Sequence, residues 1–171
     1  MNEQQEIYAV VDEEDRVIGK ATREEIHRKG LLHRSVHIFV FNRAGQLYIQ
    51  KRSMAKDMYP GCWDSSASGH VDFGESYETA AVRELEEELG LKARVIQWFK
   101  IKACAETGWE HVTFFTAHAP GEVRPNPDEI MEGKYIDIPR LSMWITHTPA
   151  IFAPGFLLVF KLAKGRGILL R

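Results

Sequence analysis

The sequence predicts an α/β domain in which a mixed β-sheet lies between helices. Strand-like and helix-like segments mix along one chain, which is typical of a sheet covered on both faces. The segment 33–42 is apolar almost throughout from Val36 to Phe41, as expected of a strand at the centre of such a sheet. The sequence has no internal repeat, low-complexity tract or linker, so residues 1–171 are expected to form a single domain.

Local signals support each element in turn. The chain is expected to open with a hairpin around an acidic turn at residues 13–15. Thr22, followed three residues later by a glutamate, is typical of a helix start, and Gly30 is expected to end that helix. A final helix is expected over 149–163, where Pro154 predicts a kink or a division into two pieces. The strands are expected at 7–11, 17–21, 33–42, 47–52, 63–68, 93–101, 103–105, 111–117 and 134–138.

The densest chemical signal is an acidic helix expected over residues 77–89. At about 100° per residue, Glu87 and Glu88 lie within about 60° of Glu84, so three carboxylates share one face. Two like charges about 4 Å apart cost on the order of 1–4 kcal/mol at a surface. Unless the helix is merely a solvated acidic surface, either some carboxylates hold a proton or a divalent cation lies between them. Hard oxygen ligands open to water favour Mg²⁺, with Mn²⁺ as a substitute, over zinc.

The spacing around these glutamates matches a known motif. Gly69, five residues, Glu75, seven residues and then Arg83-Glu84-Leu85-x-Glu87-Glu88-x-Gly90-Leu91 fill every defined position of the Nudix box, residues 69–91. The chain therefore resembles a Nudix hydrolase. The resemblance implies an α/β/α sandwich with a mixed sheet between helices. It also implies hydrolysis of a nucleoside diphosphate linked to another moiety X, by metal-activated water.

The resemblance also assigns residues to roles. Carried over by position, Glu84, Glu87 and Glu88 are the expected metal ligands, together with the backbone carbonyl of Gly69. Arg83 is expected to hold Glu84 in place through a charge-assisted hydrogen bond. The general base is left open in this family, between Glu84 and a glutamate from a later loop. The loop candidates are Glu106, Glu110, Glu129 and Glu132.

A second resemblance extends beyond the box. It rests on Gly30-Leu31-Leu32-His33-Arg34, Gln50-Lys51-Arg52-Ser53, Lys56, Tyr59-Pro60-Gly61 and Ser68-Gly69-His70, which are similar to isopentenyl-diphosphate isomerase. That enzyme is a Nudix relative that moves a double bond in a five-carbon diphosphate. The similarity implies that Arg52 and Lys56 bind the diphosphate of the substrate.

The isomerase site is incomplete in this sequence. His33 and His70 match two of its metal-binding histidines and Glu110 matches its catalytic glutamate, whereas the third histidine falls at Ile26. The catalytic cysteine of the isomerase is Ser68 here, and a hydroxyl is a poorer acid and base than a thiol at neutral pH. These departures favour hydrolysis. The alternatives are an isomerase-like enzyme and a non-catalytic nucleotide-binding Nudix module.

Composition limits the classes of partner that the protein is expected to bind. The formal charge is −2 and no long basic run occurs, so a small-molecule diphosphate is the expected partner and nucleic acid is not. No apolar run is long enough to span a bilayer, and no membrane partner is expected. A polar N-terminus and only two cysteines favour a reducing cytoplasm. The family resemblance suggests a homodimer, and the loops 53–62, 104–111 and 120–134 are expected to select X.

Overall fold

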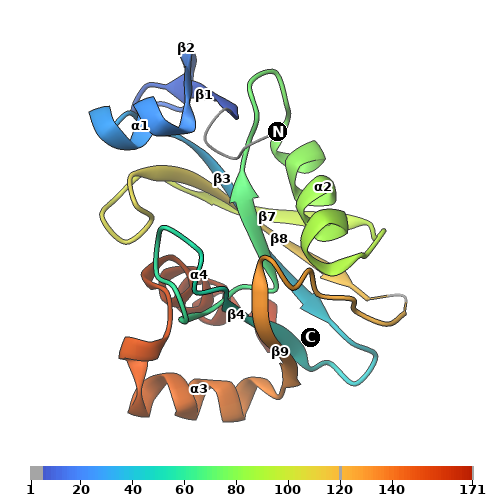
Figure 1. The fold of residues 1–171 in the computed structure, drawn as a ribbon. Coiled ribbons are helices and arrows are strands. Elements are labelled where there is room, and N and C mark those ends of the chain that lie inside the picture. The colour runs from blue at the N-terminus through green and yellow to red at the C-terminus, as the bar shows by residue number, and fades with distance from the viewer. Residues whose placement is uncertain (1–5, 120, 171) are drawn as a thin grey trace.

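A mixed sheet forms the centre of the computed structural model, which describes residues 6–119 and 121–170 (Figure 1). The strands are β1 Ile7–Val11, β2 Val17–Thr22, β3 His33–Phe41, β4 Leu47–Arg52, β5 Trp63–Asp64, β6 Ala67–His70, β7 Val95–Ile101, β8 Glu110–His118 and β9 Ile130–Ile136. The helices are α1 Arg23–Lys29, α2 Tyr77–Leu89, α3 Ile138–His147 and α4 Pro154–Gly165, with short 3₁₀ turns at Pro149–Ile151 and Ile168–Leu170.

Strand β3 organises the larger sheet. It pairs in parallel with β8 and antiparallel with β4 and β6, while β7 and β9 extend the sheet beyond β8 and β4. The strands β1 and β2 form a separate hairpin. A parallel pair flanked by antiparallel pairs makes the sheet mixed, as the sequence predicts.

The two faces of β3 build two cores. Phe39 and Phe41 pack in a cluster with side chains of α3 and α4, whereas Val36, Ile38 and Val40 pack against α2. Accordingly, α2 and α4 lie on opposite sides of the sheet in Figure 1. The predicted α/β sandwich, with a mixed sheet between helices, is confirmed.

Several predicted boundaries change. Residues 103–105 are not a strand, and the strand expected at 134–138 begins earlier, as β9. Helix α3 was not predicted, although Asp137 at its N-cap and a proline in its first turn are ordinary start signals. The final helix is divided, with a 3₁₀ turn before Pro154 and α4 after it, which confirms one of the two predicted outcomes.

Candidate active site

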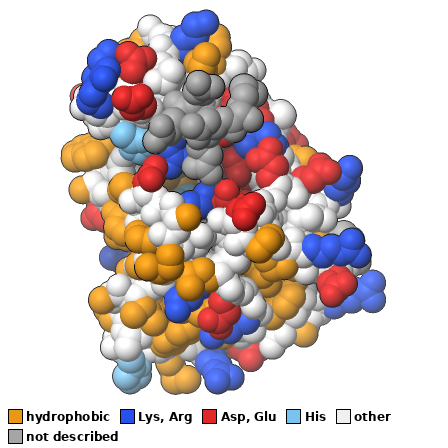
Figure 2. All heavy atoms as spheres, in the orientation of Figure 1, with side chains coloured by type: hydrophobic (Ala, Val, Ile, Leu, Met, Phe, Trp, Pro, Cys, Tyr) orange, Lys and Arg blue, Asp and Glu red, His pale blue; other side chains and the backbone are white. Residues whose placement is uncertain are grey.

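A cavity of about 420 Å³ opens between the acidic helix α2, the polar end of β3 and the start of α4. Its walls carry many carboxylates, among them Glu84, Glu87, Glu88 and Glu110. Basic side chains from three other segments, Arg23, Arg52 and Lys56, also line it. Figure 2 shows one face of the molecule, where acidic side chains gather in the upper half and hydrophobic side chains cover much of the lower left.

Local sequence fixes the start and the end of the acidic helix. Ser76 caps α2 by accepting a hydrogen bond from the backbone N–H of Thr79, and Gly90 ends the helix in the left-handed conformation with φ 62°. Between these caps, Leu85 and Leu89 are fully buried against the sheet. That packing fixes the rotation of the helix and turns Glu84 and Glu88 inward toward the cavity.

Glu84 and Glu88 are buried, with 9% and 6% of their surface exposed. Burial, followed by the charge of Glu88, raises the pKa of Glu84 well above its usual value. Burial raises the pKa of Glu88 to about 7, although hydrogen bonds from Gln50 and from the backbone N–H of Ser68 oppose this shift. Two adjacent buried carboxylates that resist ionisation are suited to a divalent cation, which would remove their mutual repulsion.

Gly69 leaves the space beside β6 that the Glu84 carboxylate occupies. A Cβ atom built on Gly69 would overlap the Glu84 carboxylate, so only glycine lets the carboxylate lie against this stretch of β6. The backbone of Gly69 thus faces the same space as the two buried carboxylates. Carboxylate and carbonyl oxygens close together form the donor set that Mg²⁺ and Mn²⁺ prefer, so these residues fit such a cation.

Arg83 connects the loop before the helix to the acidic face. Its Nη1 donates to Glu84 Oε1 at 2.7 Å and to Glu87 Oε2 at 3.2 Å. Its Nε and Nη2 donate to both oxygens of Glu75, and Nη2 also donates to the carbonyl of His70. Arg83 therefore takes the place expected from the sequence, holding Glu84 by a charge-assisted hydrogen bond.

The third box carboxylate lies at the rim. The Glu87 side chain is 58% exposed, in contrast to its two buried neighbours. Among the described residues, the group that brings three potential ligand atoms within 4.8 Å of one another is His33, His70 and Glu110, not the three box glutamates. Glu87 would have to turn inward to share a cation with Glu84 and Glu88.

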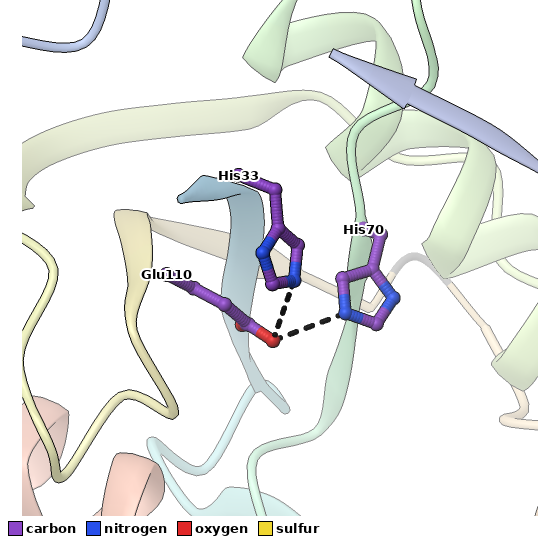
Figure 3. Close-up of side chains that lie close together, drawn as sticks. All are labelled: His33, His70 and Glu110. Atoms are coloured by element: carbon purple, nitrogen blue, oxygen red, sulfur yellow. Dashed lines mark hydrogen bonds and ion pairs between the residues drawn. The ribbon is translucent and has the colours of Figure 1, made fainter. Parts of the chain in front are cut away.

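His33, His70 and Glu110 form a second polar cluster, shown in Figure 3, and two of its members, His70 and Glu110, line the same cavity. Glu110 Oε1 lies 3.0 Å from His70 Nε2 and 3.3 Å from His33 Nε2. His33 Nδ1 lies 3.0 Å from the carbonyl of Leu31, to which it can donate a hydrogen bond, and Nε2 is the nitrogen that faces Glu110. His33 Nε2 is buried without a hydrogen-bond partner, because its contact with Glu110 lacks hydrogen-bond geometry.

The surroundings of this cluster suit a cation as well. Burial would raise the pKa of Glu110, but His70 and His33 outweigh it and hold that pKa well below its usual value. Tyr8, from the N-terminal hairpin, stacks on the His70 ring with 4.6 Å between centroids. An unpartnered imidazole nitrogen beside an ionised carboxylate is an arrangement found at transition-metal sites.

Ile26 stands at the position of the third isomerase histidine, and the structure shows where this residue and its neighbour lie. Ile26 is buried in the apolar cluster that joins α1 to the hairpin, so it cannot supply a ligand. The next residue, His27, faces the cavity, with ring centroids 5.9 Å from His33 and 6.1 Å from His70. Burial, then the charges of His70 and His33, lower the pKa of His27. A third imidazole therefore borders the cluster from an adjacent position on α1.

The two predicted phosphate-binding cations line the cavity, but each has an acidic partner. Arg52 Nη1 donates to Asp64 Oδ2 at 3.1 Å, and Arg52 Nε donates to the carbonyl of Met58. Lys56 forms an ion pair with Glu129. Sequence spacing could not predict these pairs, because Asp64 and Glu129 belong to segments brought close only by the fold.

The four loop glutamates predicted as candidate general bases differ in whether they line the cavity. Glu106, Glu110 and Glu129 line the cavity, whereas Glu132 is not among its lining residues. Sequence reasoning missed Gln50, which donates from Nε2 to Glu88 Oε2. A signal was present, since a glutamine in the middle of a buried strand requires a polar partner.

The raised pKa of Glu88 predicts a pH-dependent stability. In EDTA, the folded protein retains a proton on Glu88 up to about pH 7, whereas the unfolded chain loses it near pH 4.5. The contribution of this group to stability is therefore lost as pH rises from 4.5 to 7, by on the order of 3 kcal/mol. Urea unfolding of wild type and Glu88→Gln across this range should show the variant gaining stability relative to wild type.

The exposed Glu86, paired only with Lys92 among the described residues, provides the control for that comparison. Glu86→Gln should leave the pH dependence of the unfolding free energy as it is in wild type. A Glu88→Gln profile parallel to that of wild type would show that Glu88 titrates normally.

Comparison with known proteins identifies relatives over most of the chain. The NUDIX domain family matches residues 31–153. An uncharacterized Nudix hydrolase of Pseudomonas aeruginosa is 40% identical over 141 residues, 81% of this chain and 82% of the relative. Isopentenyl-diphosphate Delta-isomerase 2 of Photorhabdus laumondii is 35% identical over 158 residues, 88% of each chain. The crystal structure of a Deinococcus radiodurans protein superposes with a TM-score of 0.72 at 27% identity, covering 83% of this chain and 90% of the other.

Proposed function

Because this chain belongs to the Nudix family, we propose that it is a Mg²⁺-dependent diphosphohydrolase acting on a nucleoside diphosphate linked to another moiety X. The observation that carries the proposal is the pair of buried carboxylates, Glu84 and Glu88, facing one cavity beside the backbone of Gly69. Burying two like charges together is costly without a cation, and a module that only binds has no need of them.

The metal would be held by Glu84, Glu88, the carbonyl of Gly69 and an inward-turned Glu87. When bound, Mg²⁺ or Mn²⁺ supplies charge neutralisation at the phosphate oxygens and activation of water. Arg83 orients Glu84, and Gln50 orients Glu88. Arg52 and Lys56 would bind substrate phosphates and would exchange their carboxylate partners, or share them, on binding.

The general base is narrowed by the direction of the pKa shifts. A base works best when its pKa approaches the working pH. The pKa of Glu84 is raised and that of Glu110 is lowered, so Glu84 is the stronger base of the two. Glu110 would then serve as an ionised partner of His33 and His70.

We include the whole chain, residues 1–171, in one catalytic domain. The hairpin and helix α1 precede the residues matched by the family, yet they contribute Tyr8 and His27 to the cavity. Among the described residues, no helix combines the length and the apolar character needed to cross a membrane. A homodimer and a cytoplasmic location stay predictions from the sequence.

The second candidate is an isomerase acting on a five-carbon diphosphate. It is favoured by the cluster of His33, His70 and Glu110 and by relatives named isopentenyl-diphosphate Delta-isomerase. Ser68 opposes it, because a hydroxyl is a poor proton donor and acceptor where a thiol would be needed.

A substrate screen separates the two candidates. The panel contains nucleoside triphosphates, nucleotide sugars, dinucleoside polyphosphates, coenzyme A, NADH and isopentenyl diphosphate, each with Mg²⁺ and with EDTA. We expect Mg²⁺-dependent release of a phosphate-containing product from at least one nucleotide, abolished by EDTA. Deuterium exchange into isopentenyl diphosphate without phosphate release would instead support the isomerase and reject the hydrolase.

A further inference from the structure

His37, in the middle of β3, is a buried histidine that the proposed hydrolysis does not use. Only 9% of its surface is exposed, and that part faces the cavity. Its Nδ1 lies 2.7 Å from the hydroxyl of Ser65, a residue with no exposed surface. Burial lowers the pKa of His37 despite the opposing charges of Asp64 and Glu110, so the imidazole is neutral at neutral pH.

The partner of Nδ1 determines what the other nitrogen offers. If Nδ1 carried the proton, the buried Ser65 hydroxyl would have no hydrogen-bond acceptor for its own hydrogen among the described residues, which is costly. We therefore assign the hydroxyl as donor and Nδ1 as acceptor, which places the proton on Nε2. Nε2 makes no hydrogen bond to another described residue, so an N–H donor remains free at the cavity wall.

That donor faces the start of α4. A Cβ atom built on Gly155 would lie 3.5 Å from His37 Nε2 and 3.6 Å from the backbone carbonyl of Glu106. The N-cap residue of α4, Ala153, offers no side-chain hydrogen bond, and Pro154 has no N–H. The N–H groups of Gly155 and Phe156 come next, and neither bonds to another described residue outside the helix.

We propose that His37 Nε2 and the free N–H groups at the start of α4 bind a phosphate group of the substrate. His37 and Gly155 both line this corner of the cavity, and the positive end of a twelve-residue helix adds to the donors there. Glu106 supplies the single acceptor, which can take the proton of a hydrogen phosphate. Because Arg52 and Lys56 are both paired with carboxylates, uncharged donors would supplement them in holding the diphosphate.

This phosphate site rests on the proposed function, because the phosphate would belong to the substrate of that reaction. Its test, however, requires no catalytic turnover. In EDTA, inorganic phosphate is titrated into ¹⁵N-labelled protein while the amide signals of Gly155 and Phe156 and the ring signals of His37 are followed. We expect saturable shifts at these three residues. D-ribose, added in a parallel titration, should leave them in place.

Two variants make the assignment specific. His37→Asn keeps an acceptor for Ser65 but removes the Nε2 donor, and it should weaken phosphate binding about tenfold. Gly155→Ala adds a methyl group at ordinary contact distance from the imidazole, so the fold is retained while the phosphate position is filled. His147→Asn, on the exposed end of α3, is the matched control and should bind phosphate like wild type.

Each outcome decides the inference. Shifts confined to Arg52 and Lys56, or equal affinity in wild type and His37→Asn, would overturn it. Shifts caused by ribose and not by phosphate would replace the phosphate with a sugar hydroxyl and would also overturn it. Glu88→Gln should retain phosphate binding in EDTA, so a failure of the proposed hydrolysis would not remove this site, and the two failures are distinguishable.

Discussion

Replacing Glu88 with glutamine is expected to lower kcat of the proposed Mg²⁺-dependent hydrolysis by about a thousandfold, equivalent to about 4 kcal/mol in the barrier. Glu88 is the more deeply buried of the two inward carboxylates, and glutamine has nearly the same shape. The substitution therefore removes a negative charge with little change in packing. Steady-state rates on the substrate found in the screen, measured over a range of Mg²⁺ concentrations, test this expectation.

Glu86→Gln is the matched control for this effect. Glu86 lies on the same helix, but it is exposed and forms an ion pair with Lys92 at 3.0 Å. Its replacement should change kcat by less than about twofold, since isolated surface pairs contribute little. If Glu88→Gln keeps full activity while His70→Asn loses it, the catalytic cation belongs to His33, His70 and Glu110 instead.

Glu88→Gln is also expected to change the free energy of unfolding, and the sign of this change relative to wild type should differ between EDTA and saturating Mg²⁺. In EDTA the loss of a buried carboxylate stabilises the protein above pH 7, whereas with saturating Mg²⁺ the wild type should be the more stable protein. Binding to the folded state alone adds stability that grows with ligand concentration, and Glu88→Gln would lose that increment. A variant that is more stable but inactive would show that Glu88 is retained for its chemistry rather than for the fold.

Much of the geometry of the candidate site could be predicted from the sequence, because the relevant signals are local. Glu84 and Glu88 are four residues apart on one helix, so helical periodicity alone places them on one face. The caps Ser76 and Gly90 are equally local. The same periodicity cannot tell which carboxylates are buried, and for this reason Glu87 was grouped with two residues that lie much deeper.

The rest depends on contacts between distant segments. The pairing of Lys56 with Glu129 joins residues more than seventy positions apart, and no local pattern reports it. The place of His27 at the cavity could not be predicted from sequence position either. Position by position, the third histidine of the isomerase falls at Ile26, yet the rotation of α1 brings the next residue to the cavity. Helix α3 was missed although its start signals were present, because a strand was extended through Asp137.

Gly69→Ala is expected to reduce kcat/KM by at least about a hundredfold, or about 3 kcal/mol, while the protein remains folded. The added methyl group would overlap the Glu84 carboxylate, which is the far end of a flexible side chain and can move away. The backbone of Gly69 does not require a glycine conformation, since its φ is not positive. The cost therefore falls on the position of Glu84, not on the fold, and Tm should change by only a few degrees.

This variant separates two roles of one residue. Alanine keeps the backbone carbonyl that is expected to bind the metal, so lost affinity for Mn²⁺ in calorimetry would report the displaced Glu84. Gly19→Ala is the control, because a Cβ atom there meets nothing within 4 Å and its φ is not positive. Normal metal binding and normal hydrolysis in Gly69→Ala would mean that the Glu84 carboxylate does not need its place beside β6. Glu88 would then bind the metal with ligands other than Glu84. The assignment of Glu84 and Glu88 together as the metal site would be wrong.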